Sequence, residues 1–244
     1  MPLPSSSSPL FLTTRWSVVL AAQGDAATDA RAALETLCRA YWYPLYAYLR
    51  RMGQAPHDAE DLTQEFFARL LEKDWLLAAD PEKGRFRTFL LVALKRFIAK
   101  EWRRATAQKR GGAQPHLPLD TTDAERRYAG EPVAALAADD IYERRWAMTM
   151  LDQALERLSA EFAQAGKAAE FDGLKRWLTA DRGQIPYGEL AAELGSSEGA
   201  VRVAVHRLRK RFRQLFREAI AGTVAEGEQV EEELRHLVAV LSRG

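Results

Sequence analysis

The sequence predicts an all-α protein, with two small helical domains joined by a flexible linker. Apolar residues recur at three- and four-residue spacing along most of the 244 residues, which is the pattern of helices with one buried face. The pattern stops between Ala105 and about Asp140. That stretch has few large apolar residues and holds the glycines and prolines expected of a linker, namely Gly111, Gly112, Pro115, Pro118, Gly130 and Pro132.

Three main helices are expected in the first domain. The first carries the apolar stripe of residues 34–52, and Pro44 inside it should kink or restart the helix. The second begins at Asp58, which can serve as its N-cap. The third runs from about Arg85 to Arg104. A short helix at residues 16–22 is expected to pack on this group.

Helical periodicity resumes at Trp146 and predicts a second domain. After Pro186, two helices are expected at residues 187–194 and 197–221, and an apolar stripe predicts a short terminal helix at residues 230–241. The expected organisation is a disordered N-terminus (1–13), a first domain (14–105), a linker (106–142), a second domain (143–222) and an acidic tail with a short helix (223–244).

Residues 187–206 have the features of a helix-turn-helix. Ala191 supplies the small residue where the two helices cross, and Gly195 tolerates the positive φ of the turn. Ser196 can cap the second helix. The apolar residues that would hold the helices together are Leu190, Leu194, Val201 and Val205. A plain helical hairpin within a core is the alternative.

Charge is strongly segregated along the chain, although its formal net value is only +1. Residues 198–217 hold seven Lys/Arg and one acid, which favours binding to nucleic-acid phosphates. Residues 85–110 hold nine Lys/Arg and one acid, interleaved with aromatic rings that could stack on unpaired bases. Residues 57–74 hold six acids and two Lys/Arg, so this helix should face solvent or a protein rather than DNA.

The sequence contains no catalytic signature, and its four histidines lack metal-ligand spacing. We therefore expect a binding protein, with no cofactor and no metal. The one cysteine, Cys38, falls on an apolar stripe, excludes an intramolecular disulfide and fits a reducing cytoplasm. No segment is long and apolar enough to span a bilayer.

Two segments resemble conserved regions of bacterial sigma factors. The second region is similar to three stretches of the first domain. These are DAEDLTQEFFARL from Asp58 to Leu70, FRTFL from Phe86, and FIAKEWRR ending at Arg104. The helix-turn-helix with its arginine-rich extension is similar to the fourth region. Two such regions without a third domain between them resemble the extracytoplasmic-function class, over about residues 34–104 and 146–220.

The resemblance implies three sets of site residues. Those expected to dock on the clamp of the largest subunit of core RNA polymerase are Asp58, Glu60, Asp61, Gln64 and Glu65. Those expected to recognise and melt the −10 promoter element are Phe86, Arg87, Lys95, Arg96, Lys100, Arg103 and Arg104. Those expected to bind the −35 element are Ser197, Glu198, Arg202, His206, Arg207, Arg209 and Lys210. The first four of that last set should meet base edges if the helix enters the major groove, and the others should mostly reach phosphates or a protein partner.

The resemblance further implies that the second domain rests on the polymerase flap and that the acidic linker passes near the active-site cleft. Whether an anti-sigma regulator binds this protein is left open. The chain departs from the class in a longer segment at 159–186, in Leu158-Ser159 where Leu-Pro is usual, and in the additional residues 14–33 and acidic tail. We expect the acidic linker and tail to cover the basic helices until polymerase binds.

Two other function classes compete with a sigma factor. One is a conventional helix-turn-helix transcriptional regulator with a separate helical regulatory domain. It would need a self-complementary dimer surface for binding a palindrome, and the sequence offers no heptad seam. The other is a helical enzyme, which the lack of a catalytic constellation disfavours.

Overall fold

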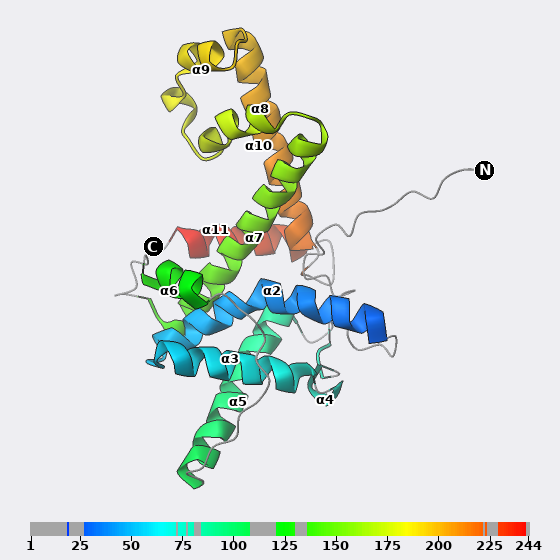
Figure 1. Cartoon of the computed structure of the whole chain (residues 1–244), viewed down its shortest axis with the longest axis vertical. Helices are drawn as coiled ribbons and strands as arrows, with labels where there is room; N and C mark the ends of the chain where they lie inside the picture. Colours follow the sequence, from blue (N-terminus) through cyan, green and yellow to red (C-terminus); the bar gives the residue numbers. More distant parts are fainter. Residues whose placement is uncertain are drawn as a thin grey trace, which may run out of the picture. The chain divides into compact units, whose positions relative to one another are not determined.

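The computed structural model describes residues 19, 27–71, 73–76, 78–80, 84–107, 121–129, 136–221, 223 and 229–242. These residues form helices and connecting turns, without a strand among them, which confirms the all-α prediction (Figure 1). The chain divides into two compact units. Unit 1 comprises residues 1–149 and 220–244, and unit 2 comprises residues 150–219. The expected helix at 16–22 and the expected disordered N-terminus lie outside the described residues, except for Val19.

Unit 1 is a helical bundle in which α2 and α3 lie side by side (Figure 1). Its core joins Tyr41 of α2 to Phe86 of α5, with ring centroids 5.6 Å apart, and Phe66 of α3 to Phe97 of α5, at 5.9 Å. All four rings are buried. The helices are α2 (Ala27–Arg51), α3 (Pro56–Leu71), α4 (Lys73–Leu76), α5 (Phe86–Ala107), α6 (Thr121–Ala129), the start of α7 (Ala138–Gln164) and α11 (Gln229–Leu241).

Two expected helix boundaries differ in the structure. Helix α2 runs through Pro44 as one element and does not restart there. An internal proline costs a helix about 3 kcal/mol, and the fully buried Tyr41 and Leu45 on either side supply tertiary packing that offsets this cost. Helix α3 begins at Pro56, two residues before Asp58. Proline suits the first helical position, because its missing N–H would have no intrahelical partner there.

Helix α6 lies within the expected linker and packs on α2. Its Glu125 accepts a hydrogen bond from Arg50 Nε, at 2.7 Å, and another from the hydroxyl of Tyr46. The bond from Arg50 is the main cause that holds the pKa of Glu125 below its usual value. The Arg50 guanidinium also lies 5.0 Å from the ring centroid of Tyr128. Part of the segment between the two domains is therefore an ordered piece of unit 1.

The terminal helix α11 is also part of unit 1, whereas the sequence suggested a separate tail. Its Glu233 is fully buried and pairs with Arg85, at 2.8 Å, and with Arg87. Arg87 pairs in turn with Glu143 of α7, at 2.8 Å. These ion pairs join α11 to the start of α5 and the start of α7, which explains why residues far apart in the sequence form one unit.

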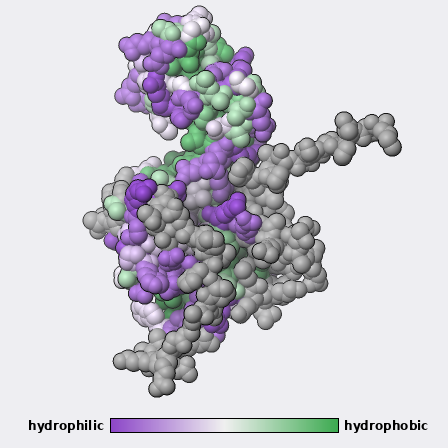
Figure 2. Space-filling model, in the orientation of Figure 1, coloured by the Kyte–Doolittle hydropathy of each residue, from purple (hydrophilic) through white to green (hydrophobic). Residues whose placement is uncertain are grey.

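Unit 2 is built around a hydrophobic core. Its buried residues include Leu158 of α7, Phe171 of α8, Leu190 of α9, and Val205 and Leu215 of α10. Hydrophilic residues cover much of the visible face of this unit (Figure 2). Its elements are the end of α7, α8 (Ala168–Leu174), the 3-10 helices η3 (Lys175–Trp177) and η4 (Arg182–Gln184), α9 (Tyr187–Glu193) and most of α10 (Glu198–Ala221).

Candidate nucleic-acid interface

Helix α5 presents one apolar face to the core and one basic face to solvent. Leu90, Leu94 and Phe97 are buried. Arg96 and Lys100, four residues apart and therefore on the same side of the helix, are exposed. Trp102 is 55% exposed, and at about 100° per residue it lies on a different side of the helix from Arg96 and Lys100. An exposed indole can stack on an unpaired base, and exposed cationic side chains can hold the phosphates.

The other expected −10 residues are divided between this face and the interior. Arg103 is exposed on the same face. Lys95 is 43% exposed, pairs with Asp139 of α7 at 2.7 Å and lies 5.9 Å from the ring centroid of Tyr48. The side chain of Arg104 lies outside the described residues.

Phe86 and Arg87 are not on the exposed face of α5. Phe86 is 2% exposed and packs in the core of unit 1. Arg87 is 3% exposed, and its guanidinium lies 4.6 Å from the ring centroid of Trp146. Burial lowers the pKa of this guanidinium, and the carboxylate of Glu143 opposes the shift. The structure thus corrects the expectation for both residues, which here hold unit 1 together rather than face a ligand.

The acidic face of α3 is opposite its buried face, which contains Phe66, Phe67 and Leu70. Asp58 and Asp61 are exposed, and Asp61 pairs with the His57 imidazole at 3.2 Å. A backbone hydrogen bond and, after it, the Asp61 carboxylate raise the pKa of His57.

The other three expected docking residues are less available. Gln64 is only 9% exposed and donates a hydrogen bond to Glu60, at 3.1 Å. Glu65 pairs with Arg69 at 3.1 Å. The most exposed carboxylates of the expected docking set are therefore Asp58 and Asp61.

The helix-turn-helix geometry expected from the sequence is present in unit 2. Gly195 has a φ of +59°, and the N–H of Ser196 donates to the carbonyl oxygen of Ala191 at 2.9 Å. Val201 is buried, as the sequence predicted. The cap of α10 is Ser197 rather than Ser196, because the hydroxyl of Ser197 accepts the N–H of Ala200 at 3.3 Å.

Most of the basic residues of α10 are solvent-exposed. Arg209, however, donates to the carbonyl oxygen of Trp177, at 2.6 Å from Nη2, and to that of Ala180, so it stabilises the turn after α8. Arg211 pairs with Glu161 of α7 at 2.5 Å, and its hydrogen bond is the main cause that lowers the pKa of Glu161. The exposed basic or imidazole side chains of α10 are Arg202, His206, Arg207, Lys210, Arg213 and Arg217.

The first turns of α10 hold an arginine with two partners. Arg202 pairs with Glu198, one turn earlier, at 2.5 Å, and its guanidinium lies 4.1 Å from the ring centroid of Tyr187. The side chains of Arg202 and Glu198 remain 57% and 52% exposed. Tyr187 was not among the expected site residues. Its only signal in the sequence was an aromatic residue at the start of the helix-turn-helix.

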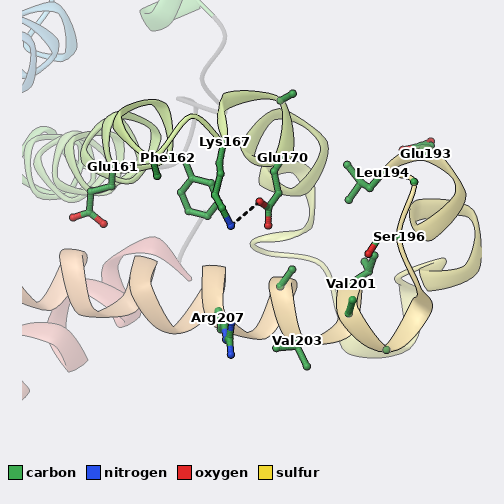
Figure 3. Close-up of a pocket in the computed structure, with 16 residues that line it drawn as sticks. Glu161, Phe162, Lys167, Glu170, Glu193, Leu194, Ser196, Val201, Val203 and Arg207 are labelled. Carbon is green, nitrogen blue, oxygen red and sulfur yellow. Dashed lines mark ion pairs between the residues drawn. The ribbon is translucent and has the colours of Figure 1, made fainter.

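A groove of about 1050 Å³ lies beside α10 in unit 2, between the end of α7, the start of α8 and the turn of the helix-turn-helix (Figure 3). Phe162, Leu194 and Val203 give it apolar surface, and Val203 is 48% exposed. Lys167 and Glu170, which form an ion pair at 3.2 Å, lie along its rim.

In the described part of the chain there is no cluster of His, Cys, Asp and Glu that could hold a metal ion. Burial raises the pKa of the Cys38 thiol to about 12, so this thiol stays protonated at neutral pH. None of the described helices has the length and hydropathy needed to span a membrane.

Comparison with known proteins finds similarity to one family over part of the chain and to a named bacterial protein over most of it. Residues 37–108 match the sigma-70 region 2 family. A protein of Mycolicibacterium smegmatis described as ECF RNA polymerase sigma factor SigE is 28% identical over 198 residues, which are 81% of this chain and 66% of the relative. This chain therefore spans slightly less than two thirds of that relative's length. No solved structure matches this chain.

Residues 37–108 are therefore similar to region 2 of the sigma-70 family, in the part of the chain where the sequence analysis found the same resemblance. The named relative is itself an ECF sigma factor, the class that the sequence resembles. The matched region contains both the acidic face of α3 and the basic face of α5.

Proposed function

We propose that this protein is a sigma factor, which binds core RNA polymerase and directs promoter recognition and transcription initiation. The observation that carries the proposal is the match of residues 37–108 to sigma-70 region 2. The structure supports it, because α5 in this region exposes the cations Arg96 and Lys100 and the indole of Trp102, which are side chains suited to binding melted DNA. It acts by binding, without catalysis of its own, and works in the cytoplasm with polymerase and the chromosome.

Each partner is assigned to one surface. The acidic face of α3, chiefly Asp58 and Asp61, docks on the clamp of the largest polymerase subunit. The exposed side chains of α5, including Arg96, Lys100 and Trp102, bind the −10 element. The exposed side chains of α10 bind the −35 element. The apolar groove beside α10 is our candidate contact for the polymerase flap, and an anti-sigma regulator would compete for these same surfaces.

A competition experiment separates this proposal from a conventional helix-turn-helix regulator. The tagged protein is mixed with purified core polymerase, without DNA, and a primary sigma factor is then titrated in. A sigma factor binds core directly and is displaced by the primary sigma factor, because both need the same clamp surface. If the protein binds only a polymerase that already carries another sigma factor, the regulator is the correct class.

The −35 assignment predicts different effects for two exposed residues of α10. Arg202 is near the start of the helix, where it can make a bidentate contact with a guanine edge worth about 1–3 kcal/mol of discrimination. Lys210 lies two turns further on, where a straight helix has left the groove floor and meets phosphates. Arg202→Ala should relax the preference at one base pair. Lys210→Ala should weaken all promoters alike and reduce the salt slope by about one.

The measurement is transcription by each mutant holoenzyme from a library with a randomised −35 element. Lys210 is a better comparison than the neighbouring Arg211, because the Arg211 side chain already forms an ion pair with Glu161. Uniform weakening of every promoter by Arg202→Ala would show that α10 does not enter the groove in this orientation.

The acidic segments of unit 1 support the expectation that the free protein is partly autoinhibited. Asp139 pairs with Lys95, and Glu125 pairs with Arg50. Both acids come from the segment between the two family regions, and both neutralise cations of the region 2 helices. We therefore expect the free protein to bind duplex DNA much more weakly than its complex with polymerase does.

Asp139→Asn should raise the affinity of the free protein for −10 single-stranded DNA by up to about fivefold, because an exposed ion pair contributes about 0–1 kcal/mol. Asp140→Asn removes an adjacent acid and serves as the matched control. Fluorescence anisotropy at two salt concentrations measures both. Equal effects of the two variants would mean that loss of net charge, and not release of Lys95, causes the change.

A further inference from the structure

The start of the helix-turn-helix carries an arrangement that the family resemblance does not assign. Tyr187 is the first residue of α9, and it is half-buried, packed against the hydrophobic core of unit 2. Its position in the fold is therefore fixed by packing. The guanidinium of Arg202, from the second helix of the motif, lies 4.1 Å from the centroid of the Tyr187 ring. An arginine at this distance from a ring face is attracted electrostatically by the ring quadrupole.

Glu198 holds the same guanidinium from its side. Its Oε1 accepts hydrogen bonds from Arg202 Nη2, at 2.5 Å, and from Arg202 Nε, at 3.2 Å. These two donors form the lateral edge of the planar guanidinium. The ring of Tyr187 and the carboxylate of Glu198 together restrict both the tilt of the plane and its rotation.

The terminal edge of the guanidinium is left for a ligand. An arginine has five N–H donors in a fixed fork, and the lateral pair faces Glu198. Among the described residues of unit 2, Glu198 is the one acceptor that Arg202 contacts, and the Arg202 side chain is 57% exposed. The two remaining parallel N–H groups, on Nη1 and Nη2, match the spacing of guanine O6 and N7 in the major groove.

We propose that Tyr187 is a positioning residue for promoter specificity: its ring holds Arg202 in the orientation that reads one guanine of the −35 element. Glu198 shares this role and does not itself read a base. The proposal rests on the proposed function of α10. The arrangement has a function beyond that of a surface ion pair. Because the Arg202 guanidinium is already oriented, its side chain loses less conformational freedom when it binds the base.

The test uses two variants of Tyr187 that differ in the ring. Tyr187→Phe keeps the ring face and the packing, and Tyr187→Leu keeps apolar packing but removes the ring face. Full-length protein with core polymerase transcribes the randomised −35 library, and the guanine preference is measured at the base pair that Arg202→Ala affects. We expect Tyr187→Phe to keep the preference and Tyr187→Leu to lower it about 2- to 30-fold, the range that follows from a cation–π contribution of about 0.5–2 kcal/mol.

The double variant Tyr187→Leu with Arg202→Ala should lose no more preference than Arg202→Ala alone, because Tyr187 acts through the arginine. If Tyr187 has only a structural role, Tyr187→Leu will weaken transcription from all promoters equally and leave the guanine preference intact. That result would overturn the proposal. Failure of the proposed function looks different, because the wild-type protein would then show no −35 preference with core polymerase.

Discussion

Asp61→Lys is expected to abolish the capture of core RNA polymerase while leaving the fold of the protein unchanged. Asp61 is half-exposed on the polar side of α3, where it pairs with the exposed His57. An exposed ion pair of this kind contributes about 0–1 kcal/mol to stability. Reversal of a charge within a docking surface costs far more, because like charges are then forced together where water is excluded.

The matched control is Glu35→Lys. Glu35 is an exposed acid of the same unit, and it too pairs with a basic residue one turn away, Arg39, at 2.5 Å. Pull-down of purified core polymerase and circular dichroism are recorded for both variants. We expect capture to be lost in Asp61→Lys and kept in Glu35→Lys. Normal capture by Asp61→Lys, with an unchanged spectrum, would remove α3 from the docking surface.

Glu233→Ala is expected to lower the free energy of unfolding of unit 1 by about 3–5 kcal/mol. Removal of one partner from a buried ion pair leaves the other charge without compensation, which is the source of this magnitude. Glu233 is fully buried and faces two guanidinium groups, of which Arg87 is itself 3% exposed. Glu143 remains beside Arg87 in the variant and offsets part of the loss.

Denaturant unfolding followed by circular dichroism gives the size of the change, and amide hydrogen exchange shows where it occurs. Glu232→Gln is the matched control, because Glu232 is the neighbouring acid on α11 and is exposed. Faster exchange should appear in α5 and α11 of the Glu233→Ala protein, with α9 unaffected. A loss of stability no greater than in Glu232→Gln would mean that α11 does not hold unit 1 together.

Periodicity and turn chemistry predicted the main helices from the sequence, but not α6, which lies within the expected linker. Apolar spacing predicted α5, α10 and α11, and the glycine at position 195 correctly marked the tight turn. These signals are local, because each depends on residues within one or two helical turns. The role of Pro44 could not be predicted in this way, because it depends on the tertiary packing of α2.

The sequence was less informative about which cations face solvent. Arg87 was grouped with the other basic residues of α5, yet it is spaced four and seven residues from the buried Leu91 and Leu94. That spacing places it on the buried side, and stricter use of the helical period could have found it. Its partners Glu143 and Glu233 are remote in the sequence, so no local pattern could supply them. The same holds for Arg209, whose acceptors are backbone carbonyl groups of another segment.

The most direct test of sigma-factor function is transcription initiation by a purified two-component system. Core polymerase, this protein and a library of promoter fragments are combined, and start sites are mapped with and without the protein. We expect defined start sites that need both components, with sequence preference at the −35 and −10 positions and loss of all transcripts in the Asp61→Lys protein. Transcription that is independent of the protein, or that requires another sigma factor in addition, would contradict it.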